Sequence, residues 1–205
     1  MQLVTELHYN PCLLFFQRAF AAEELIFETQ EHYQKQSYRN RCHILSAQGV
    51  VPLSIPVKNG NKKIKISDIE IDYGQRWLDV HWRTIQSAYG SAPFFEYYGD
   101  YVWDVYERRP EKLFQLNLDL FNLFSKLLKL NKSVRHTETY LQEYDAPVWD
   151  GRNEIHPKKE PDNLRLLPYQ QVFGKQFVPN LSILDLLFNL GPEAASYLQN
   201  PKDIR

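Results

Sequence analysis

Cysteine is scarce in this chain of 205 residues, and its placement argues against two common kinds of small domain. The two cysteines, Cys12 and Cys42, form no Cys-x-x-Cys pair, so neither a zinc ribbon nor a disulfide framework is expected. The six histidines show neither His-x-His nor His-Glu-x-x-His spacing. We therefore predict no metal site.

Glycine is also scarce, and the 8 glycines form none of the motifs that cradle a phosphate or expose a nucleophile. The chain has no glycine-rich fingerprint, so neither a dinucleotide Rossmann site nor a P-loop is supported. It has no Gly-x-Ser-x-Gly, so an α/β-hydrolase elbow is not expected either.

Long apolar runs are missing, and charge of one sign does not dominate. No stretch reaches the roughly 18 apolar residues of a transmembrane helix. The N-terminus has no basic segment followed by an apolar run, so no signal peptide is expected. The net charge is -1, which gives no reason to expect binding to nucleic acid or to an anionic membrane. A cytoplasmic location is the expectation.

The composition that remains is that of an ordinary globular domain. Hydrophobic residues make up 43% of the chain and aromatic residues 14%, enough for a sizeable core in one domain spanning 1–205. The aromatic rings could line a concave pocket. Filling the core and its surface grooves is the more common use of such rings.

The first 28 residues predict a βαβ unit. Weak alternation over 2–8 indicates a strand, Pro11 suits the first turn of a helix over 11–22, and residues 24–28 read as a second strand. Two strands joined by a helix favour a parallel pair. We therefore expect an α/β fold with a mostly parallel central sheet.

The rest of the chain predicts an added hairpin and a helical C-terminal half. The hairpin is formed by 42–45 and 51–57, and alternating isoleucines predict one or two further strands over 64–71. Segment 131–168, rich in proline and charge, is expected to be loop-rich and to act as a lid. Helical patterns cover 77–89, 93–106, 110–130 and a last helix between Ser182 and Gly191.

Five segments, taken in their order and spacing, resemble the WbqC-like protein family. The first carries Tyr9, any residue and Pro11, followed by an aromatic pair, and the second carries Asn40 followed by Arg41. The segments are 9–16, 37–41, 53–57, 81–95 and 169–191. The resemblance implies a role in the synthesis of O-antigen and related surface polysaccharides, and it implies no particular reaction.

Two places depart from the family pattern. The family opens with Gln-Pro where this chain has Glu6 and Leu7, and it often has an Asp pair and a Gln where this chain has Thr29, Gln30 and His32. A metal role for that Asp pair would therefore not carry over. Such variants resemble a Bacteroidetes-like branch of the family.

His81 is the candidate general base. An imidazole exchanges protons near neutral pH, and His81 shares a helix face with Trp77, Ile85 and Tyr89. The alternative is a packed histidine that bonds one backbone group. The pattern leaves both readings open.

Arg41 is the candidate anion-binding residue, with Arg39, Asn40 and Lys35 beside it. Guanidinium groups bind phosphate or carboxylate in a bidentate fashion. This stretch follows the second strand, and open α/β sheets bind ligands beyond the carboxyl ends of their strands. The alternative is a solvated loop with ordinary surface pairs.

Three tyrosines and a turn complete the predicted site. Tyr9 and Asn10 fill the first strand-to-helix turn, where the helix N-terminus could receive an anionic group. Tyr38 and Tyr89 are expected to shape the pocket. Cys12 could be a nucleophile opposite His81, but its apolar surroundings favour a packed cysteine.

Two classes of function remain open. The first is a transferase that modifies a nucleotide-linked or lipid-linked sugar, for example with an acyl or aminoacyl group. It would need no resident cofactor, and its donor would be a nucleotide-activated or CoA-type molecule. The second is a non-catalytic binding or scaffold protein of glycan synthesis. Convergence of His81 and Arg41 in one cleft would favour the enzyme.

Overall fold

The computed structural model describes residues 1–159 and 166–199. Its central sheet has four strands in the order β5-β2-β1-β6, and every neighbouring pair is parallel. The strands are β1 (Gln2–Thr5), β2 (Glu24–Phe27), β5 (Ser133–His136) and β6 (Trp149–Asp150). The predicted parallel pairing of the first two strands and the α/β class are therefore confirmed.

Helix α1 (Leu13–Ala21) connects β1 to β2 and buries an aromatic face. Its Phe16 ring stacks on Phe121 of α4 (Leu113–Leu127), with 6.1 Å between ring centroids. The Phe27 ring of β2 meets the same Phe121 ring edge-on at 4.8 Å. These rings join sheet and helices into one core. Of the two expected uses of the aromatic residues, lining a pocket or filling the core, these rings serve the second.

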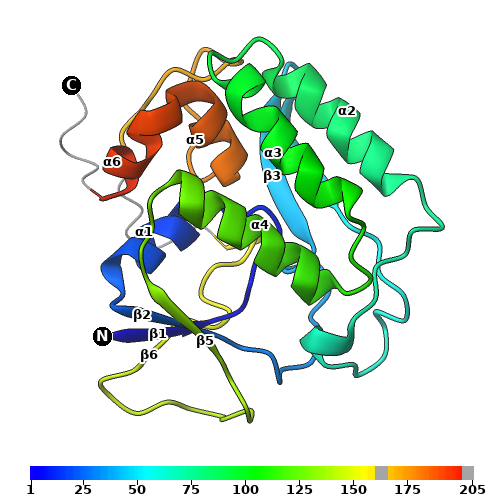
Figure 1. Cartoon of the computed structure of the whole chain (residues 1–205), viewed down its shortest axis with the longest axis vertical. Coiled ribbons are helices and arrows are strands. Elements are labelled where there is room, and N and C mark those ends of the chain that lie inside the picture. The colour runs from blue at the N-terminus through cyan, green and yellow to red at the C-terminus, as the bar shows by residue number, and fades with distance from the viewer. Residues whose placement is uncertain (160–165, 200–205) are drawn as a thin grey trace.

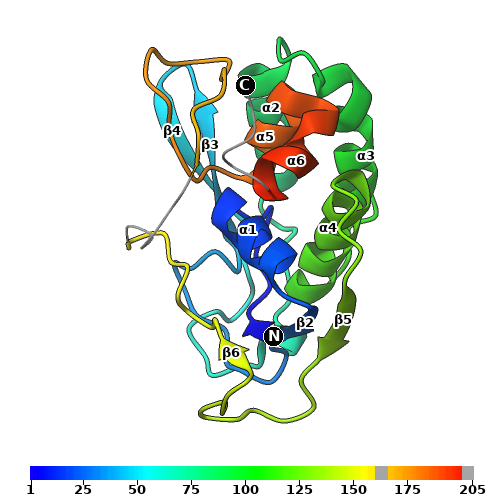
Figure 2. The ribbon, with the colours of Figure 1, turned by 90° about the vertical axis from the view of Figure 1, so that its left-hand side faces the viewer.

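The hairpin of β3 (Arg41–Ser46) and β4 (Gly49–Ser54) forms a second, antiparallel sheet, as predicted. Arg41 lies opposite Ser54, and His43 lies opposite Pro52. Figure 2 shows this hairpin on one side of the molecule and helices α3 (Phe95–Glu107) and α4 on the other, with α1, α5 (Ile183–Leu190) and α6 (Ala194–Gln199) between them.

The helices of the C-terminal half pack above the central sheet (Figure 1). Helix α2 begins and ends where the sequence pattern predicts, and Ser182 caps α5 by accepting a bond from the Leu184 amide at 3.3 Å. The remaining helices are α2 (Trp77–Tyr89), α3 (Phe95–Glu107), α5 (Ile183–Leu190) and α6 (Ala194–Gln199), with two short 3-10 turns, η1 (Ile66–Asp68) and η2 (Gly191–Glu193).

Two segments differ from their predicted form. The prediction of strands over 64–71 is wrong: this stretch contains η1, and its β pairing with other described residues is limited to isolated bridges such as Val57 to Ile71. Segment 131–168 supplies β5 and β6 to the central sheet, and its residues 160–165 lie outside the described residues. Its role as a lid stays a prediction.

None of the helices in the described part of the chain combines the length and the apolar character needed to cross a membrane.

Candidate functional site

A cleft of about 860 Å³, called the first cleft below, lies where the hairpin meets the start of α2. Its walls are the ends of β3 and β4, the loops 33–36 and 56–61, and the first helical turns after Arg76. Four of the predicted site residues line it, namely Lys35, Asn40, Arg41 and His81. His81 and Arg41 therefore share one cleft, the arrangement that favours an enzyme over a non-catalytic binding protein.

The charge of the first cleft is one-sided. Its cations are Lys35, Arg41 and Arg76, and no acidic residue is among the described residues that line it. The whole chain has 24 basic and 25 acidic residues, so this local excess of positive charge is not a reflection of composition. A cleft with cations and no carboxylates attracts an anionic ligand.

Contacts with described neighbours use only part of the hydrogen-bonding capacity of Arg41. Its Nε donates to Ser54 Oγ at 2.9 Å across the hairpin, and the described contacts leave its two terminal nitrogens for a ligand. Asn40 donates to the Ile55 carbonyl at 2.7 Å, while its buried Oδ1 has no partner among the described residues. The Trp77 indole Nε1, also in the cleft wall, is likewise buried and unpartnered there.

His81 forms part of the cleft wall and is only 4% exposed. Its Nδ1 lies 2.9 Å from the Tyr9 hydroxyl, which lies 2.8 Å from the Tyr106 hydroxyl. Asn10 donates to that Tyr106 oxygen at 2.7 Å. Because Asn10 donates to Tyr106 through its nitrogen, the Tyr106 hydroxyl can donate to the Tyr9 oxygen. The Tyr9 hydroxyl then donates to Nδ1 of His81, or accepts from it in the other tautomer of the ring. Tyr9 and Asn10 therefore stand behind the histidine rather than in the cleft.

The imidazole of His81 is neutral at pH 7. Burial lowers its pKa to about 4, although a hydrogen bond to the Ser54 backbone raises it. A backbone group that favours the charged imidazole must be accepting its proton, so the carbonyl is the partner. The ring is thus oriented on one side by a phenol and on the other by a peptide oxygen.

Replacing His81 with Gln is expected to flatten the acid side of the stability profile. The native ring has a pKa of about 4 and an unfolded histidine about 6.5, so the unfolded chain binds more protons between these values. The contribution of neutral His81 to the free energy of unfolding is fully present above pH 6.5. It is lost as the pH drops toward 4, by on the order of 3 kcal/mol.

Urea unfolding of both proteins from pH 4 to 7.5 measures this contribution as the difference between the two slopes. Parallel profiles would show that His81 is protonated as easily in the fold as outside it.

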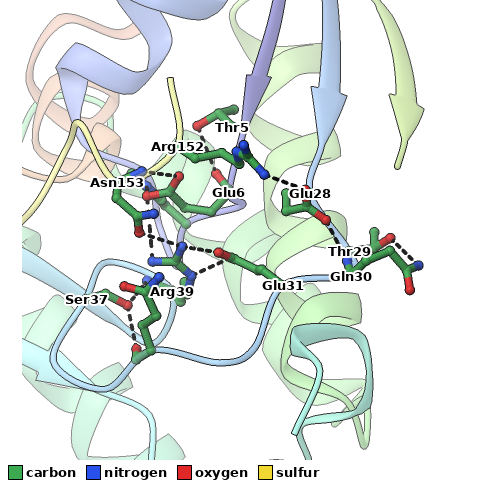
Figure 3. A network of polar contacts seen from close by, with 12 residues as sticks. Thr5, Glu6, Glu28, Thr29, Gln30, Glu31, Ser37, Arg39, Arg152 and Asn153 are labelled. Atoms are coloured by element: carbon green, nitrogen blue, oxygen red, sulfur yellow. Dashed lines mark hydrogen bonds and ion pairs between the residues drawn. The ribbon is translucent and has the colours of Figure 1, made fainter. Parts of the chain in front are cut away.

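Arg39 is placed differently from Arg41, although only Asn40 separates them. Its side chain is 1% exposed, and its Nε and Nη2 each donate to the Glu31 carboxylate at 2.6 Å (Figure 3). Its Nη2 also donates to Asn153 Oδ1 at 2.9 Å, and its Nη1 lies 3.7 Å from Glu6. Arg39 does not line the first cleft, so we do not count it among the cations that meet the ligand.

This buried network occupies the carboxyl ends of the parallel strands, where the ligand was expected. Glu6 follows β1, Glu28 follows β2, and Arg152 follows β6, with Arg152 Nη1 donating to Glu28 at 3.2 Å. Burial raises the pKa of Glu6, but contacts with His8 and Arg39 outweigh it and lower the value to about 2. Side chains of the protein itself thus occupy the space beyond the carboxyl ends of the strands. The first cleft lies against the hairpin instead.

The remaining predicted residues lie away from the first cleft. Tyr89 is fully buried and donates to Asp185 Oδ1 at 3.0 Å. Tyr38 lines a separate cleft beyond the hairpin. Burial raises the pKa of the Cys12 thiol to about 11, which agrees with a packed cysteine.

The N-terminus of α1 is also closed to a ligand. The Leu13 amide donates to the Leu181 carbonyl at 3.1 Å, and the Leu14 amide donates to Asn180 Oδ1 at 3.0 Å. The turn before the helix is buried, with Asn10 0% exposed. The 180–181 segment therefore takes the place that the sequence suggested for an anion.

Tyr33, Arg76 and Trp77 are among the residues of the cleft that sequence reasoning missed. Trp77 was predicted only as part of a packed face, and nothing in the pattern marks Tyr33 or Arg76. Within the described residues, no group of three or more His, Cys, Asp or Glu side chains gathers so that it could hold a metal ion.

Comparison with known proteins places these features in a family context. The family model described as the WbqC-like protein family matches residues 7–155 and 160–197. An uncharacterised protein of Mycobacterium tuberculosis is 28% identical over a 226-residue alignment that covers 96% of each chain. No solved structure matches the chain. The Bacteroidetes-like branch stays a prediction.

Proposed function

The chain belongs to the WbqC-like protein family, which is associated with polysaccharide biosynthesis, and on that premise we propose that it is a transferase acting on a phosphorylated sugar. The sugar would be linked to a nucleotide or a lipid and would bind in the first cleft. One observation carries the proposal: His81 and Arg41 line the same cleft, which has no carboxylate among its described residues.

The cleft offers separate groups for the charge and for the hydroxyls of such a ligand. The terminal nitrogens of Arg41 match a phosphate in the bidentate manner, and Lys35 and Arg76 add positive charge. Among the described residues Asn40 Oδ1 is an unpartnered acceptor and Trp77 Nε1–H an unpartnered donor, and a small local opening of the cleft wall would let ligand hydroxyl groups pair with these buried atoms. A buried polar atom without a partner is costly, so a ligand that pairs with both gains affinity.

In this proposal His81 activates the acceptor group after one change in its bonding: the acceptor hydroxyl takes the place of the Ser54 backbone at the second ring nitrogen, and Nδ1 carries the hydrogen and donates to the Tyr9 oxygen. Tyr9 with Tyr106 keeps the ring in place. Its pKa of about 4 means that the ring is unprotonated at neutral pH, the form that a general base requires. The same low pKa makes it a weak base, so its contribution rests on position more than on proton affinity. The transferred group would be an acyl or aminoacyl group from a nucleotide-activated or CoA-type donor, and the reaction would take place in the cytoplasm.

Arg41→Ala is expected to weaken the binding of a uridine diphosphate sugar by about 10- to 100-fold, because a charge-assisted hydrogen bond is worth roughly 1.5–3 kcal/mol. Isothermal titration measures the dissociation constant, and the melting temperature should stay within a few degrees. Arg83→Ala is the matched control, since Arg83 is exposed on α2 and does not line the cleft. It should bind like the wild type.

Equal affinity of the Arg41→Ala variant and the wild type would remove the anion site from the first cleft. Binding that survives with no transfer to any acceptor would instead favour the alternative of a non-catalytic glycan-binding protein.

A further inference from the structure

A second cleft of about 500 Å³ lies farther along the same hairpin and has no part in the proposal above. It is lined by Tyr38, His43, Lys158 and Lys159, and it is closed by the segment 178–181. Tyr38 is 6% exposed, and its hydroxyl lies 3.5 Å from Nδ1 of the half-buried His43. A phenol, an imidazole and two ammonium groups thus border one hollow.

The charge of the second cleft has the same sign as that of the first. Lys158 and Lys159 are its charged residues, and the described residues that line it include no carboxylate. Burial and the nearby Arg41 charge both lower the pKa of His43, so its ring donates and accepts hydrogen bonds without charge at neutral pH. This lining suits an anion that also presents hydrogen-bonding groups.

The two clefts are neighbours on β3. Arg41 belongs to the first and His43 to the second, and residues two apart on a strand point to the same face. Their Cα atoms are separated by roughly 6–7 Å, the rise of two strand residues. The Lys158 ammonium donates to Gln36 Oε1 at 2.6 Å, which joins a wall of the second cleft to a wall of the first.

We propose that the second cleft binds the second substrate of the transfer reaction and that this substrate also carries a phosphate group. This inference rests on the proposed function, because a transferase must hold donor and acceptor side by side. The protein then binds two phosphorylated molecules at once, one on each side of the Gln36–Lys158 bridge. Lys158 and Lys159 meet the second phosphate, and His43 and Tyr38 meet its neighbouring polar groups.

The test uses inorganic pyrophosphate and one reporter in each cleft. The ring C–H resonances of His43 report on the second cleft, and the indole N–H resonance of Trp77 reports on the first. His43→Gln and Trp77→Phe assign these signals. Pyrophosphate is expected to shift both signals of the wild type in a saturable way.

Two variants separate the sites. The double variant Lys158→Ala/Lys159→Ala should weaken the His43 response by about tenfold and leave the Trp77 response within about twofold. Arg41→Ala should do the reverse. Lys129→Ala/Lys132→Ala is the matched control, because neither lysine lines either cleft.

A Trp77 shift at pyrophosphate concentrations that never move His43 would overturn the second site and leave the proposed function standing. So would a double lysine variant that responds like the wild type. A His43 shift without a Trp77 shift would contradict the proposed function instead, and with it the assignment of a second substrate.

Discussion

Replacing Arg39 with Met is expected to lower the free energy of unfolding by about 3–5 kcal/mol, the usual cost of removing one partner from a buried ion pair. Arg39 is 1% exposed and donates twice to Glu31, which is itself 5% exposed. Methionine fills much of the volume but leaves the carboxylates of Glu31 and Glu6 without their cation. Urea unfolding at pH 7 measures the loss.

Arg41→Met is the matched control, because it makes the same change two residues away at a partly exposed position. Among the described residues the Arg41 side chain has one hydrogen bond, to Ser54, so the loss of stability should stay below about 1 kcal/mol. If the Arg39→Met protein were as stable as the Arg41→Met protein, the network in Figure 3 would not hold the strand ends together.

Gly191→Ala is expected to destabilise the protein by about 2–5 kcal/mol through two separate effects. The residue has φ of +53°, a region that side chains rarely adopt, which costs roughly 1–3 kcal/mol. An added Cβ would also lie 2.5 Å from the Phe94 ring, and overpacking of this kind costs typically 1–3 kcal/mol.

Gly49→Ala isolates the first of these effects. Gly49 also has a positive φ, of +101°, but a Cβ there would meet nothing within 4 Å. Thermal unfolding should show a smaller loss for Gly49→Ala than for Gly191→Ala. Equal losses would mean that the Phe94 ring moves aside without cost and that the packing of η2 against α3 is loose.

Several parts of the fold could be predicted from the sequence because local signals agreed with tertiary packing. Helix α2 has its apolar residues at helical spacing and ends before Gly90. Ser182 and Gly191 mark the two ends of α5. The strands of the βαβ unit are short, but their order along the chain allows only a few arrangements, and the parallel one is found.

The two outer strands of the sheet carried no such signal. All four residues of β5 are exposed, because β5 is an edge strand, and β6 contains two residues. An edge strand held by backbone hydrogen bonds needs no alternation of apolar side chains. The sequence of 131–168 therefore gave no signal for β5 and β6, and the segment was predicted to be loop-rich.

Helix α4 shows a different limit. Its run of apolar residues leaves no clean polar face, a pattern that favours burial on nearly every side. Gln115 and Asn122 are nevertheless exposed, and Leu123 and Leu127 are only partly buried. Those two leucines border a surface groove with Tyr97 and Tyr101 of α3. An apolar side chain can face water, so the pattern alone does not fix which side of a helix is covered.

The site was predicted in part. Arg39 and Arg41 show why some of the predicted residues do not line the cleft. Both arginines were expected to bind an anion, but Arg39 precedes β3 and enters a buried network, while Arg41 is the first residue of β3 and reaches the cleft. Tyr9, Asn10 and Tyr89 are core residues that support His81 or α5. Distinguishing a buried arginine from an exposed one requires its acidic partners, and no local pattern pairs Arg39 with Glu31, eight residues before it, or with the more distant Glu6.

A crystal structure of the complex with a nucleotide sugar tests most directly whether the first cleft binds a phosphorylated sugar. We expect its phosphates in the first cleft, with oxygens at roughly 3 Å from the terminal nitrogens of Arg41 and with a sugar hydroxyl near Asn40 or Trp77. A ligand bound elsewhere, for example in the aromatic groove beside Tyr97 and Tyr101, with Arg41 still facing solvent, would contradict it.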